Sequence, residues 1–486
     1  MTKIKQLHRL TTGIPGLDRL LGGGLFETGI YIVQGEAGAG KTIFANQICF
    51  HQAAIRRRAV YYTLLTEAHD RMLGFLQNLA FVDPAQVPKA VMYVSGFKVL
   101  EAGGLDGVVR SIRDMLAHER PALLVVDGLA IVEEVAPSTT ALKKFLHEMQ
   151  SVAAMFNCTM LLLTNSGSSR PVHAEHTMVD GIFELRHETV RLKPTRTLEV
   201  SKFRGVGQLR GIHTVLITDR GMSVYPRIEL VLQAATAMTA PANDARRPFG
   251  LPVLDQAIGG GLKPSSNTML VGPSGIGKTL LSMHFLNAGA IAGETGILFT
   301  FYERRDEIVD KARRLGMEPL ARAIEQGLVE VVWQSSVEAH VDMIGADLVS
   351  AFERLQPARV VVDGMHGFQV TEDYPDRIQD VFSAFADFFV TRGATMVFTA
   401  ESQDIVGEPV RPPFANASRM CQNIIALRYT EVAGRVARAI AVIKTRDADF
   451  DNGIREFTVT LRGIEVGQVI EGRDKLLVGQ SRSSRG

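Results

Sequence analysis

The chain has 486 residues, of which 46% are hydrophobic and 22% are charged, and its formal net charge at pH 7 is +1. This near-neutral balance argues against a protein that is drawn as a whole to nucleic acid or to a membrane surface. The sequence has no apolar run long enough to span a bilayer, no apolar core of a signal peptide at its start, and three widely spaced cysteines. We therefore expect a cytoplasmic protein that has no membrane partner, and we do not expect it to bind nucleic acid.

The first feature along the chain is a glycine-rich segment that matches the phosphate-binding P-loop pattern. It consists of Gly35, Glu36, Ala37, Gly38, Ala39, Gly40, Lys41 and Thr42. In such a loop the backbone N–H groups point at a phosphate, Lys41 would contact the β- and γ-phosphates, and the Thr42 hydroxyl would bind Mg²⁺. Apolar residues 31–33 before the loop and the i, i+4 pair Phe44 and Ile48 after it predict a buried strand followed by a helix.

An apolar run over residues 121–126 ends in Asp127. An apolar strand that ends in a carboxylate fits the Walker B role, in which the acid holds the water shell of Mg²⁺. Alone this pattern is weak, because a buried strand often ends in Asp at an ordinary turn. It gains weight from its position after a P-loop and from its recurrence, described below.

A strand-like segment near residue 200 contains Lys202 and Arg204. Alternate side chains of a strand share a face, so we expect these two cations to point the same way. From the spacing alone, a solvated strand edge is the simpler interpretation.

The entire pattern recurs in the second half of the chain. Lys41 and Lys278 are 237 positions apart, and Asp127 and Asp363 are 236 positions apart, so the sequence contains an internal duplication. The second P-loop consists of Gly272, Pro273, Ser274, Gly275, Ile276, Gly277, Lys278 and Thr279. Asp363 ends the second Walker B-like strand, and Lys444 and Arg446 repeat the Lys-x-Arg pattern.

The duplication predicts two domains joined by a linker. We place the first domain at residues 1–232, a small-residue linker at 233–247, the second domain at 248–466 and a tail at 467–486. Apolar strand-like runs alternate with helix-like segments in both copies, at residues 30–34, 59–65, 122–127 and 159–164 and again at 268–271, 296–302, 359–363 and 394–399. This alternation predicts an α/β fold with a mainly parallel sheet, and a P-loop at the carboxyl end of a strand in each copy.

Taken together, the duplicated motifs resemble the KaiC family of RecA-superfamily ATPases in its double-domain form. The resemblance implies two tandem RecA-like P-loop NTPase domains, with ATP and Mg²⁺ as cofactors and Thr42, Asp127, Thr279 and Asp363 at the metal. It also implies a homo-hexameric ring with ATP held between neighbouring subunits. In such a ring Lys202, Arg204, Lys444 and Arg446 would reach the γ-phosphate of the next subunit and act as catalytic residues.

The sequence departs from the family where two adjacent glutamates usually follow the strand after the P-loop helix. The second copy has Tyr302 and Glu303 there, and the first has Leu65 and Thr66, with Glu67 one residue later. Glu303 and Glu67 are the candidate general bases, and a displaced or missing base costs on the order of 10²–10⁴ in rate. We therefore expect slow hydrolysis at both sites, with the first the candidate for a site that only binds ATP.

The family's clock members phosphorylate an adjacent Ser-Thr pair, and this chain has Ser418 and Arg419 at those positions. We expect a nucleotide-state signalling or timing switch that binds and slowly hydrolyses ATP, acts on an unidentified regulatory protein and is a candidate for autophosphorylation at Ser418. Two alternatives stay open at this point: a nucleic-acid ATPase of the recombinase or helicase kind, and a serine/threonine protein kinase.

Overall fold

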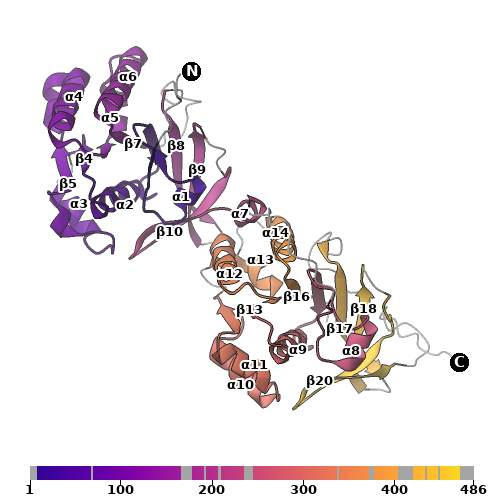
Figure 1. Ribbon diagram of the computed structural model, residues 1–486. Helices are drawn as coiled ribbons and strands as arrows, with labels where there is room; N and C mark the ends of the chain where they lie inside the picture. Colours follow the sequence, from indigo (N-terminus) through magenta and orange to yellow (C-terminus); the bar gives the residue numbers. More distant parts are fainter. Residues whose placement is uncertain are drawn as a thin grey trace, which may run out of the picture. The chain divides into compact units, whose positions relative to one another are not determined.

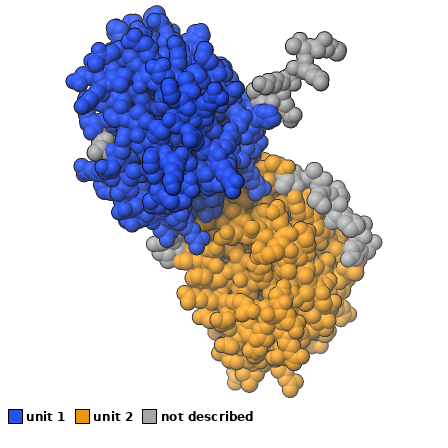
Figure 2. All heavy atoms as spheres, turned by 60° about the vertical axis from the view of Figure 1, so that its left-hand side comes forward, with its two compact units in different colours: residues 1–227 blue, residues 228–486 orange. Residues whose placement is uncertain are grey.

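The computed structural model describes residues 8–66, 69–165, 178–190, 193–205, 209–234, 245–335, 339–371, 377–402, 420–432, 435–446 and 449–470. The chain divides into two compact units, residues 1–227 and 228–486 (Figures 1 and 2). Each unit is built on its own nine-stranded sheet. In the described part of the chain, no helix has both the length and the apolar character that a membrane span requires.

The first unit alternates strands and helices along the chain. Its elements are β1 (Arg9–Leu10), α1 (Leu17–Leu20), β2 (Leu25–Phe26), β3 (Ile30–Gly35), α2 (Lys41–Ala54), β4 (Ala59–Thr63), α3 (His69–Leu76), a 3₁₀ turn (Pro84–Gln86), β5 (Val91–Ser95), α4 (Phe97–Glu119), β6 (Leu123–Asp127), α5 (Leu129–Val135), α6 (Thr139–Phe156), β7 (Thr159–Asn165), β8 (Gly181–Val190), β9 (Lys193–Phe203), β10 (Ile212–Thr218) and β11 (Gly221–Tyr225).

The large sheet of this unit has the order β11-β10-β9-β8-β3-β7-β6-β4-β5. The strands from β8 to β5 are parallel, while β9, β10 and β11 extend the sheet in antiparallel pairing. The central parallel strands β3, β4, β6 and β7 are buried on both faces and consist of nearly continuous apolar runs. Strand β3 lies between β7 and β8, which places the P-loop near the middle of the sheet edge.

Helices cover both faces of this sheet. On one face, Phe44 and Ile48 of α2 pack against Val33 and Val125. On the other face, the apolar residues of α4, α5 and α6 form a second core cluster, and these three helices lie together in Figure 1. Phe44 and Ile48 therefore lie in the core as the sequence predicted, but α2 is buried along most of its circumference and does not present a single core-facing stripe.

The second unit begins with α7 (Ile228–Ala234) and repeats the same plan. Its further elements are α8 (Pro252–Ala257), β12 (Asn267–Gly272), α9 (Lys278–Ile291), β13 (Gly296–Thr300), α10 (Arg305–Arg314), α11 (Glu318–Glu325), β14 (Val329–Trp333), α12 (Val341–Leu355), β15 (Arg359–Asp363), α13 (Met365–Thr371), α14 (Arg377–Thr391), β16 (Thr395–Glu401), β17 (Asn423–Val432), β18 (Arg435–Lys444), β19 (Arg455–Thr460) and β20 (Gly463–Val469).

Its sheet has the order β14-β13-β15-β16-β12-β17-β18-β19-β20, with parallel strands from β14 to β17 and antiparallel pairing beyond. Strand for strand, this is the order found in the first unit. The structure thus confirms the fold class expected from the sequence, two tandem RecA-like α/β domains.

Helix α7 belongs to the second unit. Asp342 of α12 accepts a hydrogen bond from the backbone N–H of Ile228 at 2.9 Å, and Arg377 of α14 donates to both carboxylate oxygens of Glu229 at 2.7 and 2.9 Å. The division between compact units therefore falls before α7. The domain and linker limits drawn from the sequence stay a prediction.

Two strands end earlier than the sequence suggested. The runs 59–65 and 296–302 are strands only as far as Thr63 and Thr300. The cause is local: the backbone N–H groups of Leu65 and Tyr302 each donate to the threonine hydroxyl two residues earlier, at 3.1 Å. This turn replaces the sheet ladder, so strand alternation cannot be used to place the side chains that follow.

Candidate nucleotide-binding sites

Each P-loop connects the central strand of its sheet to a long helix, β3 to α2 and β12 to α9. Gly40 and Gly277 directly precede these helices with φ of 104° and 119°, a region that L side chains rarely adopt. At Gly40 a Cβ would also lie 2.7 Å from Ile217 Cδ1. The two glycines therefore allow each helix to begin with its N–H groups directed at the loop, which is the geometry of a phosphate site.

The P-loop lysines fold back over their own loops. Lys41 Nζ donates to the carbonyl oxygens of Gly35 at 2.7 Å and Glu36 at 3.0 Å. Lys278 Nζ donates to those of Gly272 at 2.7 Å and Pro273 at 2.8 Å. Burial lowers the pKa of both ammonium groups, and the nearby carboxylates oppose the shift. Each site thus holds a partly desolvated cation where an anion would stabilise it.

In the second unit, the two residues expected at the metal are in direct contact. Thr279 Oγ1 donates to Asp363 Oδ2 at 2.7 Å, and Thr399 Oγ1 of β16 donates to Asp363 Oδ1 at 2.7 Å. Asp363 is 1% exposed, and this burial raises its pKa while the two hydroxyls and Lys278 oppose the rise. The carboxylate is therefore oriented by two donors from two different elements.

A cleft of 320 Å³ opens over this pair. Its lining includes Lys278, Thr279, Tyr302, Lys311, Asp363 and Glu401. The cleft lies at the carboxyl edge of the parallel strands, where open α/β sheets bind their ligands.

In the first unit a different side chain reaches the Walker B carboxylate. Tyr61 of β4 donates its phenol hydrogen to Asp127 Oδ2 at 2.5 Å. Its ring lies 5.6 Å from that of Tyr93, centroid to centroid, and Tyr93 in turn donates to Asn46 Oδ1 at 2.7 Å. The Asn46 amide donates to the carbonyl of Thr42 at 2.8 Å. A network of three hydrogen bonds and one contact between aromatic rings thus connects Asp127 to Thr42 in the first turn of α2.

The side chains present fit Mg²⁺ and a nucleoside triphosphate. A hydroxyl and a carboxylate are the oxygen ligands that Mg²⁺ uses beside substrate phosphates, and Thr279 and Asp363 offer them at one point. The loop N–H groups and Lys278 suit the phosphates. Thr42 and Asp127 supply the same groups in the first unit.

A comparison of the sequence with models of protein families identifies the family of the chain. A family model described as "ATPase: KaiC" matches residues 10–229 and 248–470, one match for each repeat. This chain belongs to the KaiC family of ATPases. The match confirms the resemblance seen in the sequence. Because the family is one of ATPases, it also assigns ATP use to the chain.

Curated KaiC proteins match over nearly the whole chain. The circadian clock oscillator protein KaiC of Parathermosynechococcus lividus is 23% identical over 499 residues, covering 99% of this chain and 89% of the relative. The circadian clock protein KaiC3 of Synechocystis sp. is 24% identical over 494 residues, covering 97% and 94%. KaiC of Synechococcus elongatus is 24% identical, covering 97% and 92%.

The structure describes one of the two candidate general bases of this KaiC-family chain, Glu303. Both carboxylate oxygens of Glu303 accept hydrogen bonds from Lys311 of α10, at 2.9 and 3.0 Å. Among the described residues that line the cleft, Lys311 is present and Glu303 is not. Glu67 lies outside the described residues, as do Ser418 and Arg419.

The Lys-x-Arg residues lie away from the P-loop of their own unit. Lys202 pairs with Ile182 near the start of β8, and Lys444 pairs with Ile424 near the start of β17. The P-loops begin at the opposite, carboxyl ends of the neighbouring strands β3 and β12. No single unit therefore brings its described Lys-x-Arg residues together with its own loop.

The sequence led us to expect that Arg204 and Arg446 point the same way as Lys202 and Lys444, because alternate side chains of a strand share a face. The structure removes the basis of this expectation. β9 ends at Phe203 and β18 ends at Lys444, so Arg204 and Arg446 come after the strands and alternation does not fix their direction. Arg204 lies 3.5 Å from Asp180, measured from Nη1 to Oδ1, and Lys444 Nζ donates to the Cys421 carbonyl at 2.8 Å.

Sequence reasoning missed Tyr61, Thr399 and Glu401. None belongs to a recognised motif, and each comes from a strand neighbouring the one that carries the motif. The ends of neighbouring parallel strands are level with each other: Asp363 pairs with Thr300, and Gly272 pairs with Glu401. Polar residues at or near the ends of the other predicted strands could therefore have been listed as candidates for the site.

Proposed function

We propose that the chain binds Mg²⁺-ATP at both P-loops, hydrolyses it slowly, and uses the state of the nucleotide as a signalling or timing switch. The observation that carries this proposal is the contact between Thr279 and Asp363, 2.7 Å apart beneath a cleft that Lys278 also lines. When bound, Mg²⁺ would neutralise charge on the phosphates, and Thr279 and Asp363 would hold it. In the first site Thr42 and Asp127 take these roles.

The proposed assembly is a homo-hexameric ring with nucleotide between subunits. The position of Lys202, Arg204, Lys444 and Arg446, at the strand ends opposite their own P-loops, supports a role in the pocket of a neighbouring chain. A basic residue supplied by a neighbour is worth about 10³–10⁵ in rate in other P-loop enzymes. Assembly and turnover are therefore coupled.

The switch acts through a change in the ring between the ATP and ADP states, which alters its affinity for a regulatory protein partner. The names of the KaiC relatives describe clock proteins, and this supports a timing role. Autophosphorylation at Ser418 is a second proposed activity, and mass spectrometry after incubation with Mg²⁺-ATP tests it.

The deciding experiment measures mass and turnover together. Mass photometry of the full chain, with and without Mg²⁺-ATP, should show a nucleotide-dependent hexamer, and phosphate release should be slow but above that of a Lys41→Ala/Lys278→Ala double variant. A chain that stays monomeric and ignores millimolar ATP would refute the proposal. Equal turnover in the parent and the double variant would refute the hydrolysis.

A further inference from the structure

The cleft of the second unit contains a carboxylate that the family resemblance does not point to. Hydrolysis needs a group that takes a proton from the attacking water, and it must lie within hydrogen-bond reach of that water. Among the described residues near the cleft, the acidic or phenolic side chains other than the metal-binding Asp363 are Tyr302, Glu303 and Glu401, and the imidazole of His366 also lines the cleft.

Tyr302 and Glu303 are poorly suited to the role. Tyr302 lines the cleft, but burial and the charges of Asp363 and Glu401 raise the pKa of its phenol, so it stays protonated and cannot accept a proton. Both oxygens of Glu303 accept hydrogen bonds from Lys311, at 2.9 and 3.0 Å, and Glu303 is not among the described residues that line the cleft. Its position suits holding Lys311 at the cleft wall.

Glu401 lies at the P-loop edge of the sheet. It is the last residue of β16, the strand between the P-loop strand β12 and the Walker B strand β15. It is level with Gly272, the first P-loop glycine, and the next backbone N–H, that of Ser402, donates to the Gly272 carbonyl at 3.1 Å.

Strand alternation fixes the direction of this side chain. Thr399, two residues earlier, bonds to Asp363, and residues i and i+2 of a strand share a face. Glu401 therefore lies on the face of Asp363 and beyond it, in the lining of the cleft. Its charge also opposes the lowering of the Lys278 pKa, as expected for a carboxylate near the P-loop lysine.

We propose that Glu401 is the general base of the second site, a role that rests on the ATP hydrolysis proposed above. The oxygen of a water molecule forms a bond to the γ-phosphorus while the bond from that phosphorus to the β,γ-bridging oxygen breaks. The proton of the water passes to the Glu401 carboxylate, ADP leaves with the electron pair of the broken bond, and inorganic phosphate is formed. Glu303 acts as a positioning residue for Lys311.

The first unit differs at the corresponding position. Asn165 is level with Gly35 as Glu401 is with Gly272, and an amide does not accept a proton at neutral pH. The same inference therefore makes the first site the slower of the two.

The test uses the full chain with Lys41→Ala, so that phosphate release reports the second site. Glu401→Gln should lower kcat about 100-fold, while KM and the affinity for a fluorescent ATP analogue with Mg²⁺ change by less than about threefold. Glu303→Gln is the matched variant and should lower kcat by a smaller factor. Glu401→Asp, which keeps the carboxylate, should retain more turnover than Glu401→Gln and shows that the fold tolerates a change here.

Three outcomes overturn the inference: Glu401→Gln with parental turnover, a larger loss in Glu303→Gln than in Glu401→Gln, or a loss of ATP affinity that accounts for the whole effect. The last result would mean that Glu401 only pairs with Lys278. Failure of the proposed hydrolysis is separate, because it would already show in the parent chain as an absence of turnover.

Discussion

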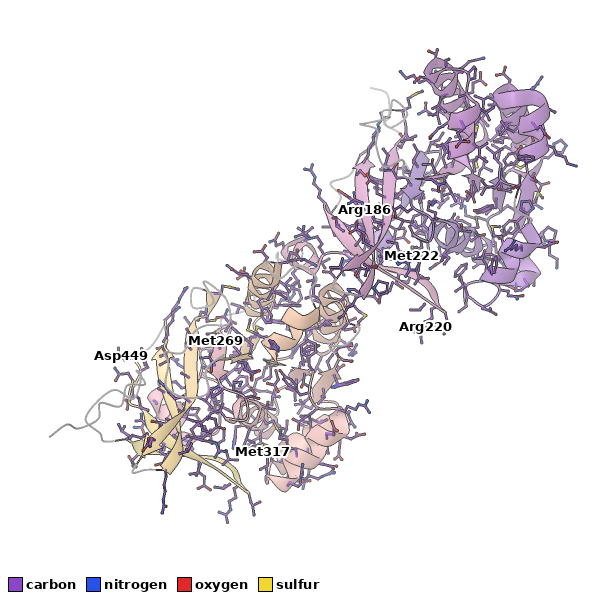
Figure 3. All side chains as sticks on the ribbon, turned by 180° about the vertical axis from the view of Figure 1, so that it is seen from behind. Arg186, Arg220, Met222, Met269, Met317 and Asp449 are labelled. Atoms are coloured by element: carbon purple, nitrogen blue, oxygen red, sulfur yellow. The ribbon has the colours of Figure 1, made fainter. Side chains whose placement is uncertain are left out.

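His284 on α9 accepts a hydrogen bond from the backbone N–H of Ile464 on β20, with 2.9 Å between Nε2 and the nitrogen. Gln47 has the same position on α2. It accepts from the N–H of Met222, labelled in Figure 3, at 2.7 Å and donates to the carbonyl of that residue at 3.0 Å. Both repeats thus tie the P-loop helix to the last strand of the sheet, one through an amide and the other through a titratable ring.

This difference predicts a pH-dependent stability of the second unit. Burial lowers the pKa of His284 from 6.5 to about 4. The neutral ring therefore stabilises the fold above pH 6.5, and this contribution of about 3 kcal/mol is lost as the pH falls toward 4. His284→Gln should remove this part of the pH dependence, because glutamine makes the equivalent contact in the first unit.

The measurement is urea denaturation at several pH values, followed by the fluorescence of Trp333, the single tryptophan of the chain, which lies on β14 of the second unit. His118→Gln, an exposed residue of α4, is the control and should leave the pH dependence as it is. An unchanged loss of stability between pH 6.5 and 4 in His284→Gln would contradict the assignment.

A buried arginine that pairs with a partly exposed glutamate in the second unit predicts a large loss of stability when it is replaced. Arg359 is 2% exposed, its Nε contacts Glu294 Oε2 at 2.5 Å, and its Nη1 donates to two backbone carbonyls at 2.7 Å. Arg359→Met should lower the free energy of unfolding by about 3 kcal/mol, because it removes these three hydrogen bonds of a buried guanidinium and leaves Glu294 with Arg247 as its partner. Trp333 fluorescence in urea measures the effect.

The matched control is Arg354→Met, which removes an exposed partner of Glu330. It should change stability by less than about 0.5 kcal/mol, as is usual for surface pairs. If the two substitutions lowered the free energy of unfolding equally, the buried contacts of Arg359 would not contribute to stability beyond those of a surface pair.

The network beneath the first site predicts a role for Tyr61 in metal binding. Loss of a side chain that orients a metal ligand typically lowers the affinity for the metal 10–100-fold. In the full chain with Lys278→Ala, Tyr61→Phe should therefore raise the Mg²⁺ concentration needed for binding of a fluorescent ATP analogue by about tenfold. Binding without Mg²⁺ should change little, because the P-loop itself is untouched.

Tyr62→Phe provides the control for that experiment. Tyr62 is the next residue of β4, is equally buried, and donates to Ser111 on the opposite face of the sheet at 3.2 Å. It should leave the Mg²⁺ dependence unchanged. If both phenylalanine variants shift it alike, the effect comes from general loosening of β4 and not from Asp127.

The sequence predicted what depends on local pattern. The P-loop spacing around Lys41 and Lys278 and the apolar runs ending in Asp127 and Asp363 are local signals, and the structure places each at the carboxyl edge of a sheet. Strand ends were overestimated at residues 65 and 302, because a side-chain hydroxyl competes with the ladder there. The contacts of Tyr61 and Thr399 depend on which strands are neighbours, and periodicity does not encode this order.

The Lys-x-Arg residues predict complementation between inactive chains. Arg446→Ala should slow turnover at the second site by about 10³-fold or more. The fold should stay intact, because Arg446 follows the end of β18, at the far end of the sheet from its own P-loop. Lys278→Ala inactivates the same site from the other side. If neighbouring chains complete each other's pockets, mixing Arg446→Ala with Lys278→Ala, both in a Lys41→Ala background, should restore phosphate release. In the mixed rings, some intact P-loops then face an intact Arg446. Activity of the mixture equal to the mean of the separate variants, in rings shown by native mass spectrometry to contain both chains, would mean that Arg446 does not act across the interface.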